Sequence, residues 1–378
     1  MADWAHFSRM KKSVRIGIIG HGNIGQVHAH HLLEGKVARA TLAAIADTDP
    51  GRRSMLPGVA GFADAAALFE AKAVDAVIVA TPHYHHPVAG IAALKAGLHV
   101  LMEKPLAVDK IDAQKLLAAH TNRRLVFATD FNQRTDPAYQ RLREMVRGGE
   151  LGAVRRVNWT ITDWFRPHSY YAGGGWRATW AGEGGGVLLN QSPHSLDLLQ
   201  WIFGQPVRVR GFCHFGRYHP IEVEDDVTAY LEFANGSHAT FITSTGEAPG
   251  TNRLEVVAEN GRVVIEPGSF RHTRNKVPVA RFSRTTKDRF AKPETVEVPV
   301  APEGSGGQHV EIVQNFVDAI LDRRPLIAPA AEGIHAVELA NAILLSAWTG
   351  RTVELPMNGT TYRRWLRRKV AESAKLRK

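Results

Sequence analysis

A glycine-rich turn between an expected strand and an expected helix constrains the fold of this chain more than any other feature. Residues 14–20 read VRIGIIG, a β-branched run typical of a buried strand. The pattern G-x-G-x-x-G starts at the last glycine of this run, and the helix-like segment QVHAHHLLEG follows it. In this order the glycines permit a tight turn and close approach to a pyrophosphate, and the helix offers its first N–H groups to the phosphates. We therefore predict a dinucleotide-binding unit, with cofactor contacts from Gly20, Gly22, Asn23, Ile24 and Gly25.

An acidic residue after the second expected strand bears on the choice of cofactor. The strand 41–46 ends in Asp47, about twenty residues past the last glycine, where a ribose-binding carboxylate belongs. A carboxylate there accepts a hydrogen bond from the ribose 2′-OH and repels a 2′-phosphate. Arg52 and Arg53 follow, and they could still meet a phosphate. We predict NAD as the preferred cofactor, with NADP as the alternative.

The first third of the chain continues to alternate between strand and helix patterns. Further strands are expected at 75–80, 99–102 and 125–129, and a helix at 109–121 with Asp109 as its N-cap. Such alternation predicts a doubly wound parallel sheet with ligands at the carboxyl ends of its strands. The residues expected to bind the cofactor at those ends are Thr81, Pro82, His83, His86, Glu103 and Lys104.

Two groups of histidines raise the possibility of a metal site. The groups are His28, His30 and His31, and His83, His85 and His86. No cysteine or carboxylate joins either group at ligand spacing, and alternate residues of a loop point in different directions. We predict no metal, and instead a contact between one histidine and the nicotinamide or the substrate.

Four blocks of sequence together resemble the Gfo/Idh/MocA oxidoreductases. The resemblance covers roughly residues 14–355, and its blocks are GHGNIG, TPHYHHPVAGIAALKAGLHVLMEKP, FNQRTDPAYQRLREMV and WRATWAGEGGGVLLNQSPHSLDLLQWIFG. It implies a Rossmann domain at 14–132 and an α/β domain at 133–355 with an open, mostly antiparallel sheet, followed by a basic tail at 356–378. Such a sheet often serves as an oligomer interface in the family, so a homodimer or homotetramer is expected.

The pattern of the second half agrees with this expectation. Strands are predicted at 154–162, 207–215, 227–233 and 239–245, and Asn235-Gly236 between the last two is a hairpin signal. The family resemblance further implies hydride transfer between nicotinamide and a hydroxyl-bearing carbon of a sugar, polyol or inositol. Two alternatives stay open. One is redox-neutral, NAD-assisted cleavage of a glycoside through a 3-keto intermediate, and the other is a non-enzymatic dinucleotide-binding regulator.

Alcohol oxidation needs a group that takes a proton, and the resemblance points to Lys104 of the EKP block. A partly desolvated lysine near a cationic nicotinamide should have a lowered pKa. The stretch GGGVLLNQSPHSLD predicts a helix from Val187 that carries Asn190 and His194 on one face, behind glycines that let backbone approach a ligand. The family commonly has Asp at position 190. An asparagine cannot take the proton, so Asn190 is predicted to hold a substrate hydroxyl, and Lys104 or His194 to be the base.

The segment 163–180, DWFRPHSYYAGGGWRATW, is rich in aromatic and hydrogen-bonding side chains. Rings suit the apolar face of a sugar, and arginines suit its hydroxyl groups. The predicted substrate-binding residues are Arg166, Tyr170, Trp176, Arg177, Asn190 and His194.

Composition adds bounds on localisation and partners. Cys213 is the only cysteine, no apolar run has the length of a membrane span, and the N-terminus lacks a signal-peptide pattern. These features favour a cytoplasmic protein with no membrane partner. The formal charge is +10, and residues 361–378 hold eight Lys or Arg against one Glu. A solvated tail that can form a helix is the favoured interpretation over a basic surface for an anionic partner, and a nucleic acid partner is not expected.

Overall fold

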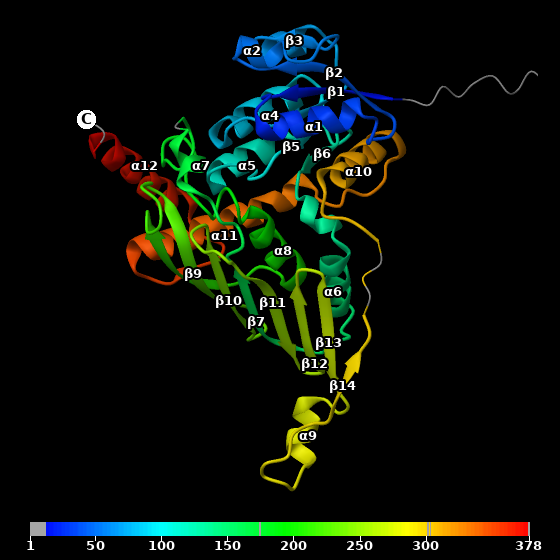
Figure 1. Cartoon of the computed structure of the whole chain (residues 1–378), viewed down its shortest axis with the longest axis vertical. Coiled ribbons are helices and arrows are strands. Elements are labelled where there is room, and N and C mark those ends of the chain that lie inside the picture. Colours follow the sequence, from blue (N-terminus) through cyan, green and yellow to red (C-terminus); the bar gives the residue numbers. More distant parts are fainter. Residues whose placement is uncertain (1–12, 174, 301, 303, 377–378) are drawn as a thin grey trace, which may run out of the picture. The chain divides into compact units, whose positions relative to one another are not determined.

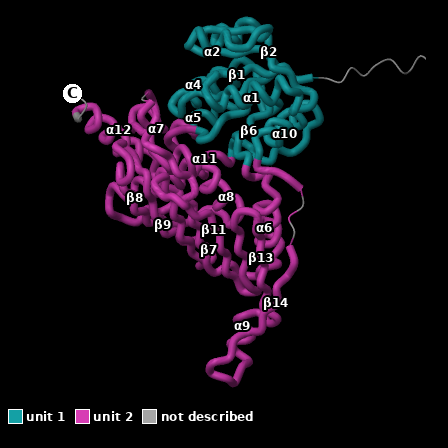
Figure 2. Tube along the Cα trace, viewed as in Figure 1, with its two compact units in different colours: residues 1–106, 114–132, 308–331 teal, residues 107–113, 133–307, 332–378 magenta. Residues whose placement is uncertain are grey.

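The computed structural model of the chain describes residues 13–173, 175–300, 302 and 304–376 (Figure 1). It divides into two compact units, each built from three segments (Figure 2). Unit 1 comprises residues 1–106, 114–132 and 308–331, and unit 2 comprises residues 107–113, 133–307 and 332–378. The domain ranges predicted from sequence, by contrast, follow one another along the chain.

Unit 1 contains a parallel sheet with the strand order β3-β2-β1-β4-β5-β6. In chain order its strands are β1 (Val14–Ile19), β2 (Ala40–Ala46), β3 (Ala60–Phe62), β4 (Ala76–Val79), β5 (His99–Met102) and β6 (Phe127–Thr129). The apolar side chains of β1 and β4 are almost completely buried, as expected for strands of a sheet covered on both faces. The predicted doubly wound parallel sheet is confirmed.

Helices follow most of these strands. They are α1 (Asn23–Leu33), α2 (Pro50–Arg53), α3 (Ala65–Glu70), η1 (His83–His85), α4 (His86–Lys95) and α10 (His309–Asp322), while α5 (Lys110–Ala119) belongs partly to each unit. Capping explains several of their starts. Asp49 and Asp64 accept hydrogen bonds from backbone N–H groups of α2 and α3. Asp109 accepts one from Asp112 in α5, which confirms the predicted N-cap.

Unit 2 contains a larger mixed sheet with the order β14-β13-β12-β11-β7-β10-β9-β8-β15. Its strands are β7 (Val154–Ile161), β8 (Arg208–Phe215), β9 (Glu224–Glu232), β10 (His238–Ser244), β11 (Asn252–Ala258), β12 (Gly261–Glu266), β13 (Ser269–Asn275), β14 (Thr295–Val298) and β15 (Val353–Glu354). Strands β10 and β7 pair in parallel, and the other pairings are antiparallel. The predicted open, mostly antiparallel sheet is therefore confirmed. The turn Asn235-Gly236 joins β9 to β10, with Gly236 at a φ of 83°.

The remaining helices pack around this sheet or extend from it. They are η2 (Asn132–Thr135), α6 (Pro137–Arg147), α7 (His168–Ala172), α8 (Pro193–Phe203), α9 (Val279–Thr285), α11 (Ala330–Thr349) and α12 (Gly359–Leu376). Helix α8 is almost wholly buried and contacts α6. A buried ion pair between Arg134 and Asp197, at 2.6 Å, ties α8 to the chain before α6.

The basic C-terminal segment is helical, as one reading of its sequence suggested. Only part of it is solvated, because Tyr362 and Leu366 are buried and Arg363 pairs with Asp109. Among the described helices, none combines the length with the apolar character that a membrane crossing requires.

Candidate active site

The glycine turn of unit 1 is shaped by close backbone contacts on one side and is open on the other. A Cβ atom added to Gly25 would lie 2.1 Å from the carbonyl oxygen of Gly20, and one added to Gly20 would lie 2.7 Å from that of Ala80. A Cβ atom on Gly22 would meet only Arg52, at 3.9 Å. No side chain of the described residues caps the start of α1. Open space beside uncapped N–H groups fits a phosphate of a dinucleotide.

The carboxyl ends of β4 and β5 lie side by side, because these two strands are neighbours in the parallel sheet. Thr81 and Pro82 follow β4, and Glu103 and Lys104 follow β5. The hydroxyl of Thr81 is buried and has no hydrogen-bond partner within the described part of the chain. A buried polar atom of this kind at a strand end fits a ligand that supplies the missing hydrogen bond.

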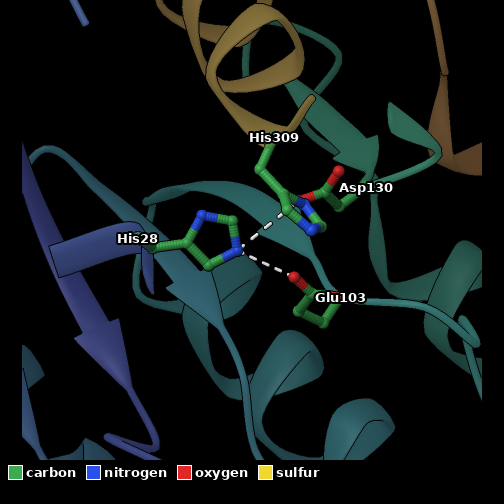
Figure 3. A group of neighbouring side chains, drawn as sticks. All are labelled: His28, Glu103, Asp130 and His309. Atoms are coloured by element: carbon green, nitrogen blue, oxygen red, sulfur yellow. Dashed lines mark hydrogen bonds and ion pairs between the residues drawn. The ribbon is translucent and has the colours of Figure 1, made fainter. Parts of the chain in front are cut away.

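Glu103 points into the interior of unit 1. One oxygen of its carboxylate lies 2.7 Å from Nε2 of His28 (Figure 3). The other oxygen accepts a hydrogen bond from the backbone N–H of Lys104. Glu103 is 3% exposed, and each of its two carboxylate oxygens has a hydrogen-bond partner within the protein. The contact of Glu103 with the cofactor stays a prediction.

His86 joins the ends of the same two strands. Its Nδ1 lies 2.8 Å from the carbonyl oxygen of Pro105, and its Nε2 lies 2.7 Å from that of Thr81. The side chain is fully buried, and this burial lowers the pKa of His86. Both ring nitrogens therefore face backbone, which gives His86 a role in holding the segment that carries Lys104.

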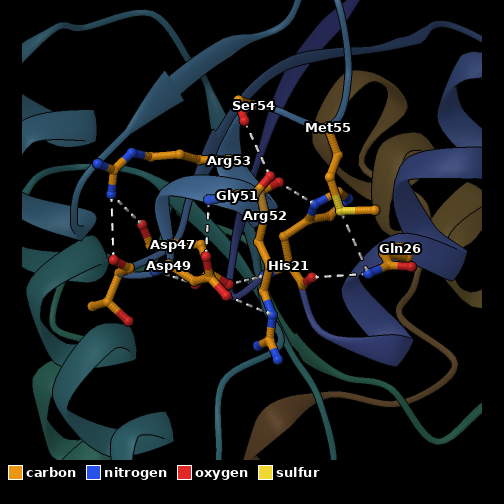
Figure 4. A network of polar contacts seen from close by, with 10 residues as sticks. His21, Gln26, Asp47, Asp49, Gly51, Arg52, Arg53, Ser54 and Met55 are labelled. Atoms are coloured by element: carbon orange, nitrogen blue, oxygen red, sulfur yellow. Dashed lines mark hydrogen bonds and ion pairs between the residues drawn. The ribbon is translucent and has the colours of Figure 1, made fainter.

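Asp47 is held beside the glycine turn at the end of β2 (Figure 4). One carboxylate oxygen accepts from the backbone N–H of His21 at 2.7 Å, and the other accepts from that of Asp49 at 2.8 Å. Arg53 turns back to donate to the carbonyl oxygen of Asp47, whereas Arg52 is half-exposed near Asp49. A fixed carboxylate at this point fits the predicted ribose contact.

In unit 2 the glycine run is fastened to strand β9 by Glu224. The carboxylate of Glu224 accepts hydrogen bonds from the N–H groups of Gly186, at 2.8 Å, and Leu188, at 3.1 Å. A Cβ atom on Gly186 would lie 2.0 Å from the carbonyl oxygen of Glu224, and one on Gly184 would lie 2.2 Å from Val108. Protein occupies the Cβ side of both glycines, and the expectation that their backbone approaches a ligand stays a prediction.

The predicted helix from Val187 is wrong in its start. Val187 to Asn190 form a single turn, closed by the N–H of Asn190 on the carbonyl oxygen of Gly186, and α8 begins at Pro193. Proline favours the first position of a helix because it lacks the N–H that would be unpaired there. Asn190 therefore lies on the turn before α8, and His194 lies in the first turn of α8 and is buried.

Asn190 has a carboxylate partner that sequence reasoning missed. Its Nδ2 donates to Glu183, and the hydroxyl of Tyr170 lies 3.4 Å from the same nitrogen. The other oxygen of Glu183 accepts from the backbone N–H of Ala178 at 2.6 Å. Glu183 is only 2% exposed. In the sequence, Glu183 is the single acidic residue within AGEGGG. No local sequence pattern predicts that its side chain contacts Asn190.

Most of the predicted substrate-binding residues lie around Tyr170. The guanidinium groups of Arg166 and Arg177 each lie 5.1 Å from the centre of its ring, and Arg177 also donates to its hydroxyl at 2.8 Å. Arg177 in addition lies 4.8 Å from the ring of Trp176. With Asn190 beside the same hydroxyl, these residues form one polar and aromatic cluster, which we call the Tyr170 cluster.

The fold and these sites define an oxidoreductase that binds NAD, and comparison with known proteins identifies its family. Residues 14–131 match the model described as the oxidoreductase family with an NAD-binding Rossmann fold, and residues 139–264 match the GFO/IDH/MocA C-terminal domain. The chain belongs to the GFO/IDH/MocA family of oxidoreductases.

Similar proteins include two inositol 2-dehydrogenases. That of Leifsonia xyli subsp. xyli is 31% identical over 86% of this chain and 91% of its own length. That of Rhizobium meliloti is 26% identical over 91% of this chain and 99% of its own length. Among solved structures, the WlbA dehydrogenase of Chromobacterium violaceum, in complex with NADH and UDP-GlcNAcA, is 26% identical with a TM-score of 0.79, covering 92% of this chain and 97% of that one.

Proposed function

We propose that this protein is an NAD-dependent dehydrogenase of a sugar, polyol or inositol, in which Lys104 or His194 takes the hydroxyl proton. The Tyr170 cluster carries the proposal, because rings, guanidinium groups and an amide together match a ring-shaped substrate with many hydroxyl groups. The names of the similar inositol 2-dehydrogenases support the same substrate class.

Bound NAD supplies the acceptor for the hydride. Unit 1 provides the residues that would hold it: the glycine turn for the pyrophosphate, Asp47 for the ribose, and Thr81 at the end of β4. His86 fixes the backbone on either side of this position through Thr81 and Pro105.

The contacts of Asn190 limit what it can do in the reaction. Because its amide nitrogen faces Glu183, its carbonyl oxygen is the atom suited to accept a hydrogen bond from a substrate hydroxyl. An amide does not take the proton, so this role falls to Lys104 or His194. A general base contributes about 10²–10⁴-fold to turnover.

The test is the formation of NADH or NADPH by the purified enzyme, with NAD or NADP respectively and a panel of pyranoses, glycosides and inositols. We expect Lys104→Ala to lower kcat by at least about 10²-fold while the variant still binds NAD. Lys95→Ala is the matched control, since Lys95 is exposed at the end of α4, and it should keep full activity.

Near-normal kcat in Lys104→Ala would overturn the assignment of Lys104, and the same comparison with His194→Ala would then test the second candidate. Consumption of a glycoside without net NADH, by enzyme that retains its cofactor through purification, would instead support redox-neutral cleavage.

A further inference from the structure

A buried group of two histidines and two carboxylates lies inside unit 1. Of its four members, only Glu103 was given a role above. Its members come from four places in the fold: His28 on α1, Glu103 after β5, Asp130 after β6, and His309 at the start of α10 (Figure 3). Each side chain offers one nitrogen or oxygen, and these four atoms all lie within 4.8 Å of one another.

The contacts within the group centre on two ring nitrogens. Nε2 of His28 lies 2.7 Å from Glu103 and 3.5 Å from Asp130, and Nδ1 of His309 lies 2.8 Å from Asp130. The side chains of His28 and Asp130 are 0% exposed and that of Glu103 is 4% exposed, whereas that of His309 is 22% exposed. The group is therefore enclosed, with access for a small ion at His309.

Two carboxylates in so little space require positive charge, because a buried and uncompensated anion is costly. Protons on the histidines are one source of that charge. They would serve one oxygen of each carboxylate, since His28 lies 2.7 Å from Glu103 and His309 lies 2.8 Å from Asp130. The other oxygen of Asp130 is buried without a hydrogen-bond partner in the part of the chain that the structure describes. A cation at the centre would contact one atom of each of the four side chains at once.

We propose that His28, Glu103, Asp130 and His309 bind one divalent transition-metal ion of the Zn²⁺ type. Imidazole nitrogens and carboxylate oxygens both bind Zn²⁺, and four protein ligands complete the tetrahedral coordination that is typical of structural zinc sites. Imidazole ligands disfavour Mg²⁺ and Ca²⁺, which prefer oxygen. Two carboxylates balance the charge of the ion.

Binding would require the side chains to shift. Tetrahedral zinc with ligand distances of about 2.0–2.2 Å places its ligand atoms about 3.3–3.6 Å from one another. The shortest contact in the group, at 2.7 Å between His28 and Glu103, would open by about 0.6–0.9 Å as the ion replaces the shared proton, and the wider separations, which lie within 4.8 Å, would close. The ion would join α1 and α10 to the ends of β5 and β6 and would fix the backbone next to Lys104.

The experiment measures metal content and absorption on the full-length protein with NAD present. After treatment with a chelator and dialysis against Zn²⁺, we expect about one tightly held ion per chain. Co²⁺ in its place should give the strong visible absorption of a tetrahedral site. The variants His28→Asn and His309→Asn should lose both signals. His30→Asn is the matched control, because His30 is on the same helix with a side chain 66% exposed, and it should keep both.

His309→Asn alters the most exposed member of the group, so it keeps the test decisive if His28→Asn does not fold. Absence of retained Zn²⁺ in the wild-type protein would overturn the proposal and leave a network held by protons. Equal Zn²⁺ binding by His309→Asn and wild type would overturn it as well, since the ion would then lie elsewhere. Neither result bears on the proposed dehydrogenase, which is tested by NADH formation.

Discussion

Asn190 departs from the family pattern, and a neighbouring carboxylate accompanies this difference. The family commonly has a carboxylate at this position, and here the carboxylate is supplied nearby by Glu183, which accepts from the Asn190 amide. An amide beside a carboxylate forms a hydrogen bond without charge repulsion, whereas two carboxylates in one buried site cannot both be ionised at low cost.

We expect Asn190→Asp to destabilise the protein at pH 8 by about 1–3 kcal/mol. The like charge of Glu183 would raise the pKa of the new carboxyl in the folded state, so stability is lost as the pH rises and is partly recovered at pH 5. Thermal unfolding at the two pH values measures this. Adding Glu183→Gln should restore the stability at pH 8, and a double variant as unstable as Asn190→Asp would contradict the explanation.

Glu224 is a second residue whose ionisation is coupled to the fold. Its burial raises the pKa of its carboxyl to about 8, while one oxygen accepts from Gly186 and Leu188. The unfolded chain ionises this group near its ordinary pKa of about 4.3. Between these values the unfolded state loses a proton that the folded state keeps, so the contribution of Glu224 to stability falls as the pH rises.

We expect Glu224→Gln to change this dependence. Relative to wild type, the free energy of unfolding of the variant should rise by on the order of 3 kcal/mol between pH 5 and pH 8, because glutamine keeps a carbonyl acceptor and does not ionise. Thermal unfolding of both proteins across this range measures the difference. A difference that does not change with pH would show that Glu224 has an ordinary pKa in the folded state.

At the scale of an element, two glycines of the turn from β1 into α1 have different roles. One is required for packing of the fold, and the other leaves space for a ligand. Gly25 has no room for a side chain against Gly20, whereas Gly22 has a φ of −77° and faces open space. We expect Gly25→Ala to lower the melting temperature. Gly22→Ala should keep the melting temperature and weaken NAD binding by at least about tenfold, since its methyl group would take space needed by the pyrophosphate.

Differential scanning fluorimetry and NAD titration distinguish the two variants. Unchanged NAD affinity in Gly22→Ala would place the pyrophosphate away from this turn.

At the scale of the whole molecule, the sheet of unit 2 carries exposed aromatic side chains on one face. Phe212 on β8 is 53% exposed and Tyr230 on β9 is 42% exposed. Arg210 pairs with Tyr230 across the two strands, which places Phe212 and Tyr230 on one face of the sheet. The predicted homodimer or homotetramer, which stays a prediction, would cover these apolar side chains.

We expect Phe212→Asp with Tyr230→Asp to convert the oligomer into a monomer, measured by light scattering after size-exclusion chromatography. Phe290→Asp is the control, because Phe290 is 89% exposed outside the sheet and should not affect assembly. A monomeric wild-type protein would contradict the prediction.

The sequence by itself determined the class of fold and the positions of its main elements. Buried strands, a glycine turn, the N-cap Asp109 and the hairpin Asn235-Gly236 were predictable because their physical causes lie within a few neighbouring residues. The parallel sheet followed from the alternation of such local patterns. Four of the predicted substrate-binding residues were named from the composition of residues 163–180, and Asn190 and His194 from the family resemblance. The structure places Arg166, Tyr170, Trp176, Arg177 and Asn190 together.

Only the tertiary structure decided which side chains became partners. Asn190 meets Glu183, Gly186 packs on Glu224, and His28 meets residues more than seventy positions away in the chain. Local sequence patterns carry no information on such pairs, because strand order and helix packing bring distant segments together only after the chain has folded. The same reason explains why two carboxylates near a histidine were invisible to a search for ligands at short spacing.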